Sequence, residues 1–154
     1  FDEGYNPRKP IFLFNQIDGL TSNIHVQAMV FATVSDNRLS ILKTLHNYCK
    51  VDVVNFHGES GPPLVHVAAA SGALEILKTL VGWGADIHAV DREYHLPIAH
   101  VAAQHGQTLV LRWLFETDLN FLRQKNSEGH TPAFSAVLWG ERDALKMCFD
   151  FGYD

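Results

Sequence analysis

The sequence predicts an all-α fold, a solenoid of about four stacked helix-turn-helix units with protruding hairpin loops. The first observation is a repeated heptapeptide: LEILKTL at 74–80 matches LSILKTL at 39–45 in six of seven letters, 35 residues apart. The second is a row of turn residues, with glycine at 72, 106 and 140 and asparagine at 37. Because Gly and Asn tolerate a positive φ, this row predicts a turn that ends one helix in every unit.

Small or β-branched residues just before each of these turns predict the first helix of each unit, one that can approach its neighbours closely. These residues are Thr33 and Val34, Ala68 and Ala69, Ala102 and Ala103, and Ala136 and Val137. We therefore expect the first helices to pack side by side along the solenoid.

Apolar residues after each turn, spaced one, three and four apart, predict an amphipathic second helix whose apolar face is core. They are Ile41, Leu42 and Leu45; Ile76, Leu77 and Leu80; Val110, Leu111 and Leu114; and Ala144, Leu145 and Cys148. A second turn is expected to end each unit, with copies at Gly84 and Gly152 and a degraded copy at 118–120.

The repeat phase divides the chain into a single ankyrin-like array of units, for which the family resemblance is given below. Its expected parts are the tail of a preceding unit (1–6), a divergent repeat (7–52) and three regular repeats (53–86, 87–120 and 121–154). The chain starts at Phe1, without a methionine, so we expect a fragment of a longer chain. In that case the last helix pair should expose apolar side chains, for example Phe134, Leu138 and Phe149.

The composition predicts a folded, soluble protein of the cell interior. Hydrophobic residues make up 47% and charged residues 19%, and the net charge is −5 with scattered basic residues. This balance argues against nucleic acid or an acidic membrane as the main target, and no apolar stretch reaches the ~20 residues of a membrane span. The two cysteines favour a reducing compartment. We expect a cytoplasmic location, or delivery into a host cell if the protein is a bacterial effector.

Residues 126–140, NSEGHTPAFSAVLWG, resemble the ankyrin-repeat unit D-x-x-G-x-T-P-L-H-x-A-A-x-x-G, which an amphipathic helix and G-A-D-x-N then follow. The segments 91–106 and 63–72 also resemble it, so the resemblance is specific over about 52–154 and weaker over 20–51. The sequence departs from the family in one extra residue between Pro and Ala in two units. Against that pattern Tyr94 stands at the usual tip glycine, and Pro62 and Leu96 stand at the usual threonine.

The histidines His66 and His100 occupy one slot, 34 residues apart, and have two interpretations. They could form a metal pair or an acid/base group, or each could donate a hydrogen bond to backbone between stacked units. The ankyrin resemblance implies the structural role, which we favour. The sequence contains no nucleophile elbow, P-loop or dinucleotide-binding glycine motif, and no ligand-spaced Cys/His quartet. We expect no enzyme activity, no cofactor and no metal.

One basic residue recurs at the same phase of every second helix: Lys43, Lys78, Arg112 and Lys146. This row could be a stripe for an acidic partner, or a solvated outer face that keeps the solenoid dissolved. We favour the solvated face, because there is only one charge per repeat and acidic residues lie beside it.

The ankyrin resemblance implies that a partner protein binds to hairpin tips and to the exposed side of the first helices, which line a concave face. The partner-binding residues it implies are Arg92, Glu93, Tyr94, His95, Glu128 and His130 at the tips, and Gln104, His105, Leu138 and Trp139 on the helices. Trp139 is the strongest single candidate, because a surface-facing Trp is a natural hot spot. Its alternative role is packing beneath a following repeat.

The sequence therefore predicts a protein–protein interaction scaffold that is not an enzyme and binds a partner protein through its concave face. An alternative is a substrate-positioning or regulatory ankyrin segment of a larger enzyme, such as a secreted bacterial effector or a modular signalling protein. The partner would then be another domain of the same longer chain, and the irregular first unit would be the contact. A third alternative is a self-associating structural array.

Overall fold

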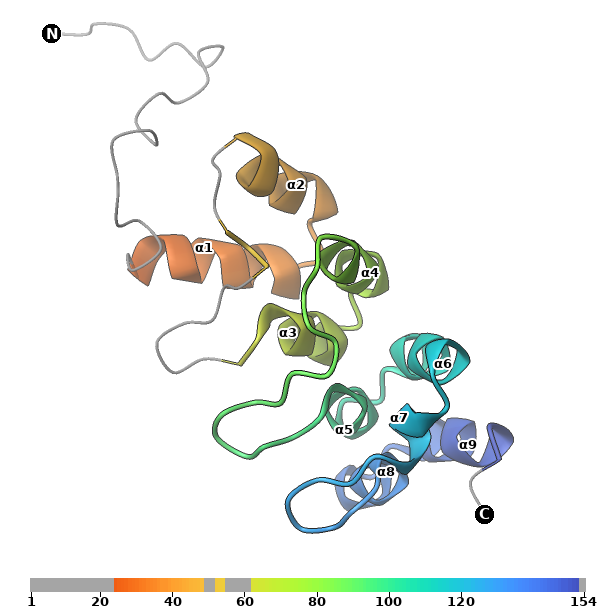
Figure 1. The fold of residues 1–154 in the computed structure, drawn as a ribbon. Coiled ribbons are helices and arrows are strands. Elements are labelled where there is room, and N and C mark those ends of the chain that lie inside the picture. The colour runs from red at the N-terminus through yellow and green to blue at the C-terminus, as the bar shows by residue number, and fades with distance from the viewer. Residues whose placement is uncertain (1–23, 49–51, 55–61, 153–154) are drawn as a thin grey trace, which may run out of the picture.

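The computed structural model describes residues 24–48, 52–54 and 62–152, which form four helix pairs and one short extra helix (Figure 1). The helices are α1 (Ile24–Ser35), α2 (Leu39–Tyr48), α3 (Leu64–Ser71), α4 (Leu74–Gly82), α5 (Ile98–Gln104), α6 (Thr108–Thr117), α7 (Asn120–Arg123), α8 (Pro132–Trp139) and α9 (Arg142–Asp150). Cys49 and the insertion near residues 7–19 lie outside the described residues.

The helix pairs stack in chain order, so the first helices form one layer and the second helices form another (Figure 1). In the first layer α1 packs on α3, α3 on α5 and α5 on α8. In the second layer α6 contacts α9. Two long loops, before α5 and before α8, project from the side of the first layer (Figure 1). The predicted all-α solenoid is confirmed for the described residues.

The predicted turns between paired helices are confirmed at all four positions. Asn37, Gly72, Gly106 and Gly140 have left-handed φ values of 55°, 71°, 66° and 75°. At Gly72, the N–H donates to Ala69 O at 3.3 Å, and the next N–H donates to Ala68 O at 2.9 Å. These paired bonds satisfy carbonyls that the end of a helix leaves open, which explains why each helix stops there.

The turn expected at 118–120 takes a different form. Gly84 and Gly152 have φ values of 99° and 88°, as the predicted second turn requires. Asp118 instead is extended, and its Oδ1 accepts the Asn120 N–H at 2.9 Å. That bond leads directly into the short helix α7, which buries Phe121 and Leu122. The side chain of Asp118 therefore starts a helical turn where the other units have a glycine turn.

The core lies between the two helix layers and continues through every described unit. Ala68, Ala69, Ala102 and Ala103 are fully buried, so the first helices approach closely as expected. The second-helix row is confirmed as core except at Ile41, which is 40% exposed. Ile41 lies on α2, the outermost second helix of the described part. A repeat position is therefore buried only where a neighbouring unit packs against it.

The same effect holds at the other end of the solenoid, on α8 and α9. Val137, predicted among the close-packing residues of a first helix, is exposed because no described unit follows α8. Phe134, Leu138 and Phe149 are exposed, as expected for this helix pair.

The extra residue in two units changes where their first helices begin. Pro63 and Pro97 are the residues just before α3 and α5, whereas Pro132 is the first residue of α8 and Thr131 precedes it. The position of Thr131 therefore corresponds to Pro63 and Pro97, and not to Pro62 and Leu96 as the sequence pattern suggested.

The shift also moves the tip of the hairpin before α5. His95 has the left-handed φ of 51°, and 34 residues later Gly129 has a φ of 81°. The assignment of Tyr94 to the tip-glycine position is therefore wrong. The extra residue enters between loop and helix, and the spacing of 34 is retained in the loop instead of the spacing to Pro.

Candidate partner-binding face

The loop before α5 forms a hairpin that presents Tyr94 to solvent. The Asp91 N–H donates to Leu96 O at 3.2 Å, and Val90 forms an antiparallel bridge with Pro97. The Tyr94 N–H donates to Asp91 Oδ1 at 2.6 Å, which folds the tip. Tyr94 is 63% exposed. A hydrogen bond between its hydroxyl and the Glu93 carboxylate, with the charge of that carboxylate, raises the pKa of Tyr94.

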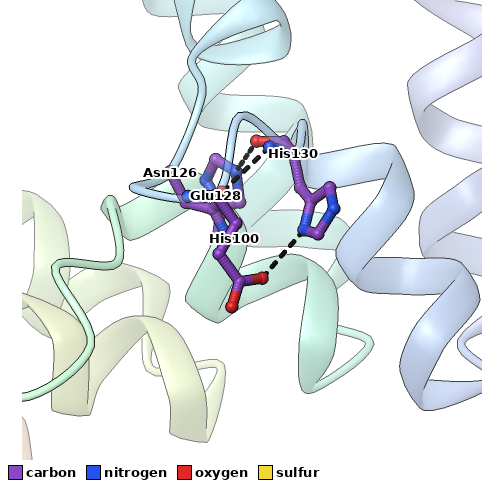
Figure 2. Close-up of polar contacts among 4 residues, drawn as sticks. All are labelled: His100, Asn126, Glu128 and His130. Atoms are coloured by element: carbon purple, nitrogen blue, oxygen red, sulfur yellow. Dashed lines mark hydrogen bonds and ion pairs between the residues drawn. The ribbon is translucent and has the colours of Figure 1, made fainter.

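The loop before α8 forms a second hairpin, which the side chain of Asn126 organises (Figure 2). Asn126 Oδ1 accepts the N–H groups of Glu128 at 3.0 Å and of His130 at 2.9 Å. The Asn126 N–H donates to His130 O at 2.9 Å, which closes the loop. One amide side chain therefore fixes both sides of the tip.

The His130 side chain is held in place at the base of this hairpin. Its Nδ1 lies 3.0 Å from Glu128 Oε2, and its ring stacks on Phe134 with centroids 3.9 Å apart. Figure 2 shows the Glu128 carboxylate turned toward the His130 ring. The pair fixes a carboxylate and an imidazole on the surface beside α8.

Two buried histidines connect each hairpin to the preceding unit. His66 Nε2 donates to Leu96 O at 3.0 Å, and His100 Nε2 donates to His130 O at 2.8 Å. Burial lowers the pKa of both histidines below the ordinary value of 6.5. The rings are therefore neutral near pH 7. Their Nδ1 atoms are buried and have no hydrogen-bond partner.

The structural interpretation of His66 and His100 is therefore confirmed. Each is on a first helix and bonds backbone in the next unit, as the ankyrin resemblance implied. In the described part of the chain, no three His, Cys, Asp or Glu residues are grouped so that they could hold a metal ion. Cys148 is buried, and burial raises the pKa of its thiol to about 11.

Two hollows lie along the hairpin side of the first helices. The first, of ≈ 300 Å³, lies between the Tyr94 hairpin and helices α3 and α5. The second, of ≈ 740 Å³, lies between the two hairpins and helices α5 and α8, and we call it the inter-hairpin hollow. Glu93, Tyr94 and Gln104 line both, so the hollows adjoin.

All the predicted partner-binding residues line these hollows. Arg92 and His105 line the first; His95, Glu128, His130, Leu138 and Trp139 line the second; Glu93, Tyr94 and Gln104 line both. The structure brings these residues together, although they come from two loops and two helices. Their part in binding a partner stays a prediction.

The sequence analysis missed the floor of the first hollow and the organiser of the second. Val67 and Val101 line the first hollow, and Asn126 and Ser135 line the second. Val67 and Val101 are 34 residues apart, and Val101 precedes Gln104 and His105 by three and four residues. The repeat period with helical spacing could therefore have found them.

The basic row lies on the second helices, away from the hairpins. Lys43, Lys78, Arg112 and Lys146 are all exposed. Lys78 Nζ lies 3.2 Å from Glu75 Oε1, and Lys146 Nζ lies 2.7 Å from Asp150 Oδ2. Two of the four charges thus pair with carboxylates of their own helix, which supports the solvated-face interpretation.

Comparison with known proteins comes after this geometry. The family model described as Ankyrin repeats (3 copies) matches residues 65–154. A Caenorhabditis elegans homolog of transient receptor potential cation channel subfamily A member 1 is 32% identical over 90 residues, which are 58% of this chain and 7% of that protein.

Two further relatives are a kinase and a phosphatase subunit. The Hydra vulgaris tyrosine-protein kinase HTK16 is 25% identical over 134 residues, 86% of this chain and 17% of that protein. Human protein phosphatase 1 regulatory subunit 27 is 40% identical over 65 residues, 42% of this chain and 41% of that protein. The chain thus spans less than half the length of each of these relatives. Within the described residues, no helix has the length and apolar character to cross a membrane.

Proposed function

Because the chain belongs to the ankyrin-repeat family, we propose that it is a recognition scaffold that binds a partner protein through one face. We call this the concave face and define it by the hairpins at 91–96 and 126–130 and the exposed positions of α5 and α8. Ankyrin repeats are in general protein-interaction modules. The partner and the face are the parts of this proposal that go beyond the family.

The observation that carries the proposal is a concentration of large exposed side chains around two adjoining hollows. Tyr94, Leu138 and Trp139 are 63%, 65% and 65% exposed, and all three line the inter-hairpin hollow. Exposed apolar patches with a polar rim are typical of interaction sites. Glu93, Gln104 and His130 supply polar groups at the same place.

Binding through this face would be close to rigid. The Asn126 side chain and the His100 bond to His130 O hold the second hairpin before any partner arrives. The first hairpin is held likewise by Asp91 and by His66. A face ordered in advance loses little conformational entropy on binding.

The proposal is tested by capture and by variants of two faces. The chain is immobilised, and captured proteins are identified by mass spectrometry and then purified for affinity measurement. We expect combined Arg92→Ala, Tyr94→Ala and Trp139→Ala to weaken binding by about 100-fold or more, since hot spots contribute 2 kcal/mol or more each. Alanine at Lys43, Lys78, Arg112 and Lys146 is the matched control, with unchanged affinity expected. The opposite pattern would overturn the proposal.

A second candidate is a positioning or regulatory segment whose partner is another part of its own protein. The relatives favour it, because the matched region is 17% of a tyrosine-protein kinase and 7% of a channel homolog. Neither candidate assigns catalysis to these residues. The discriminating observation is the full-length sequence: a catalytic or channel domain beside the repeats favours the second candidate.

A further inference from the structure

The inter-hairpin hollow combines negative charge with exposed aromatic surface. Glu93 and Glu128 are its carboxylates, one at each hairpin tip. The hollow has no lysine or arginine in its lining. Arg92, the nearest basic residue of the tip in sequence, lines the first hollow and not this one. The whole chain also carries a net charge of −5, so its field agrees in sign with that of the hollow.

Both carboxylates keep acceptor capacity for a ligand. Glu128 Oε2 accepts a hydrogen bond from His130 Nδ1 at 3.0 Å, and Glu93 accepts one from the Tyr94 hydroxyl. A carboxylate has about four lone-pair sites, so one such bond leaves most of them open. These bonds also hold each carboxylate in a fixed direction, which reduces the entropy that a ligand would have to remove.

Tyr94 and Trp139 bring aromatic faces to the same space from opposite sides. Tyr94 projects from the first hairpin and Trp139 ends α8, and each is more than half exposed. An aromatic face attracts a cation through its quadrupole, and Trp does so most strongly. An acidic or purely apolar side chain would not use the two carboxylates, whereas a cation uses both features.

We propose that the inter-hairpin hollow recognises a basic side chain, an arginine, in an exposed segment of a partner protein. A guanidinium is planar, so it can stack on Trp139 or Tyr94 while donating two parallel hydrogen bonds to Glu93 or Glu128. A lysine ammonium has the charge but neither the plane nor the fork, and it is expected to bind more weakly. This inference rests on the proposed function and names the chemistry of its partner.

The test uses short peptides of defined chemistry as probes. The probe is acetyl-alanyl-arginyl-alaninamide, compared with the same tripeptide carrying citrulline, lysine or glutamate in place of arginine. Citrulline has nearly the shape of arginine without the charge. Binding is followed by NMR through the indole N–H signal of Trp139, which the variant Trp139→Phe identifies.

We expect a saturable shift of this signal with the arginine peptide, in the millimolar range. Citrulline and glutamate peptides should bind at least about tenfold more weakly, because hydrogen bonds between charged groups are about twice as strong as neutral ones. Added salt should weaken the binding of the arginine peptide. Lysine should fall between arginine and citrulline.

Variants that remove one charge and keep the shape locate the site. Glu93→Gln and Glu128→Gln should each weaken the arginine peptide by about three- to tenfold. Glu116→Gln is the matched control, because Glu116 is an exposed carboxylate on α6, away from the hairpins. Equal affinity for arginine and citrulline, indifference to both hollow variants, or no saturable shift with any peptide would each overturn the inference.

The outcome separates this inference from the proposed function. If the peptides fail but a captured partner still depends on Tyr94 and Trp139, the face binds a partner of other chemistry and only this inference falls. If the arginine peptide binds but no variant of the concave face affects the captured partner, the inference holds and the proposed function falls.

Discussion

Two contacts between units can be compared position by position: the first seam, between repeats 53–86 and 87–120, and the second seam, between repeats 87–120 and 121–154. At both seams a buried histidine donates to a hairpin carbonyl 30 residues further on, at 3.0 Å and 2.8 Å. At both, the residue before the second helix reaches back to the glycine turn of the preceding unit. It is Gln107 at the first seam and Glu141 at the second.

The two reaching side chains occupy the same place but have different chemistry. A β-carbon added at Gly72 would lie 2.9 Å from the Gln107 amide carbon, and one added at Gly106 would lie 2.9 Å from the Glu141 carboxyl carbon. Gln107 Nε2 donates to Ala70 O at 2.8 Å. The equivalent carbonyl at the second seam belongs to Gln104, and an ionised carboxylate has no hydrogen to donate to it.

The difference teaches that the backbone geometry of a seam does not depend on every side-chain bond within it. The histidine bond is present at both seams, whereas the reaching side chain donates at one seam only. We therefore expect the histidines to account for more of the stacking energy than Gln107 does. The predictions below test this order, beginning with the largest effect.

The first prediction concerns the seam histidines. His66→Ala and His100→Ala should each lower the free energy of unfolding by about 3 kcal/mol, because each leaves a cavity and an unpaired buried carbonyl. Urea denaturation followed by circular dichroism measures the change. His105→Ala, at an exposed position of the same helix layer, should cost less than about 1 kcal/mol. A cost below that level at either seam would show that the seams are not equivalent.

The second prediction exchanges the reaching side chains. Glu141→Gln should raise the free energy of unfolding by about 1 kcal/mol, because an amide can donate to Gln104 O as Gln107 does to Ala70 O. Gln107→Glu should lower it by about 1–2 kcal/mol, because the bond to Ala70 O is lost. The two variants are each other's control in the same denaturation experiment. Changes of the same sign would mean that the seams differ in more than this one group.

The third prediction concerns pH and is the smallest. Burial lowers the pKa of His66 and His100 below 6.5, so the unfolded chain binds protons more readily than the folded chain. Stability from these groups is therefore complete above about pH 6.5 and falls as the pH decreases toward their folded pKa values, by at most about 1.4 kcal/mol per unit of pKa difference.

Urea denaturation at about pH 7.5 and about pH 5.5 measures this loss. Combined His66→Gln and His100→Gln should reduce it, since glutamine can donate to the same carbonyls and does not titrate in this range. The control His105→Gln should leave it unchanged. A loss of the same size in the double variant would assign the pH dependence to other groups.

Much of the fold was predictable because the repeat fixes it locally. The left-handed turns at Gly72, Gly106 and Gly140 and the buried alanine pairs depend only on residues within the unit. The burial of Ile41 was not predictable from its repeat position, because it depends on which neighbours are present. Helix α7 was missed because Asp118 and Asn120 suit a turn as well as a helix start.

The candidate site was predictable in its members but not in its details. Repeat phase and the ankyrin resemblance were sufficient to select residues that line the two hollows. They did not fix whether Tyr94 or His95 has the left-handed backbone, because an extra residue before Ala102 can be absorbed in the loop or at the helix start. The bond from Gln107 to Ala70 was missed because it crosses 37 residues and leaves no periodic signal.

The bond from His100 to His130 O has a consequence for how such a chain can be divided. The carbonyl that it holds belongs to the hairpin of the next unit, so the shape of each recognition loop is encoded partly one repeat upstream. A unit cut at its sequence boundaries would keep its helices but lose the donor that sets its own loop. The smallest portable piece is instead one loop together with the histidine-bearing helix before it, and a graft or a circular permutation should respect that boundary.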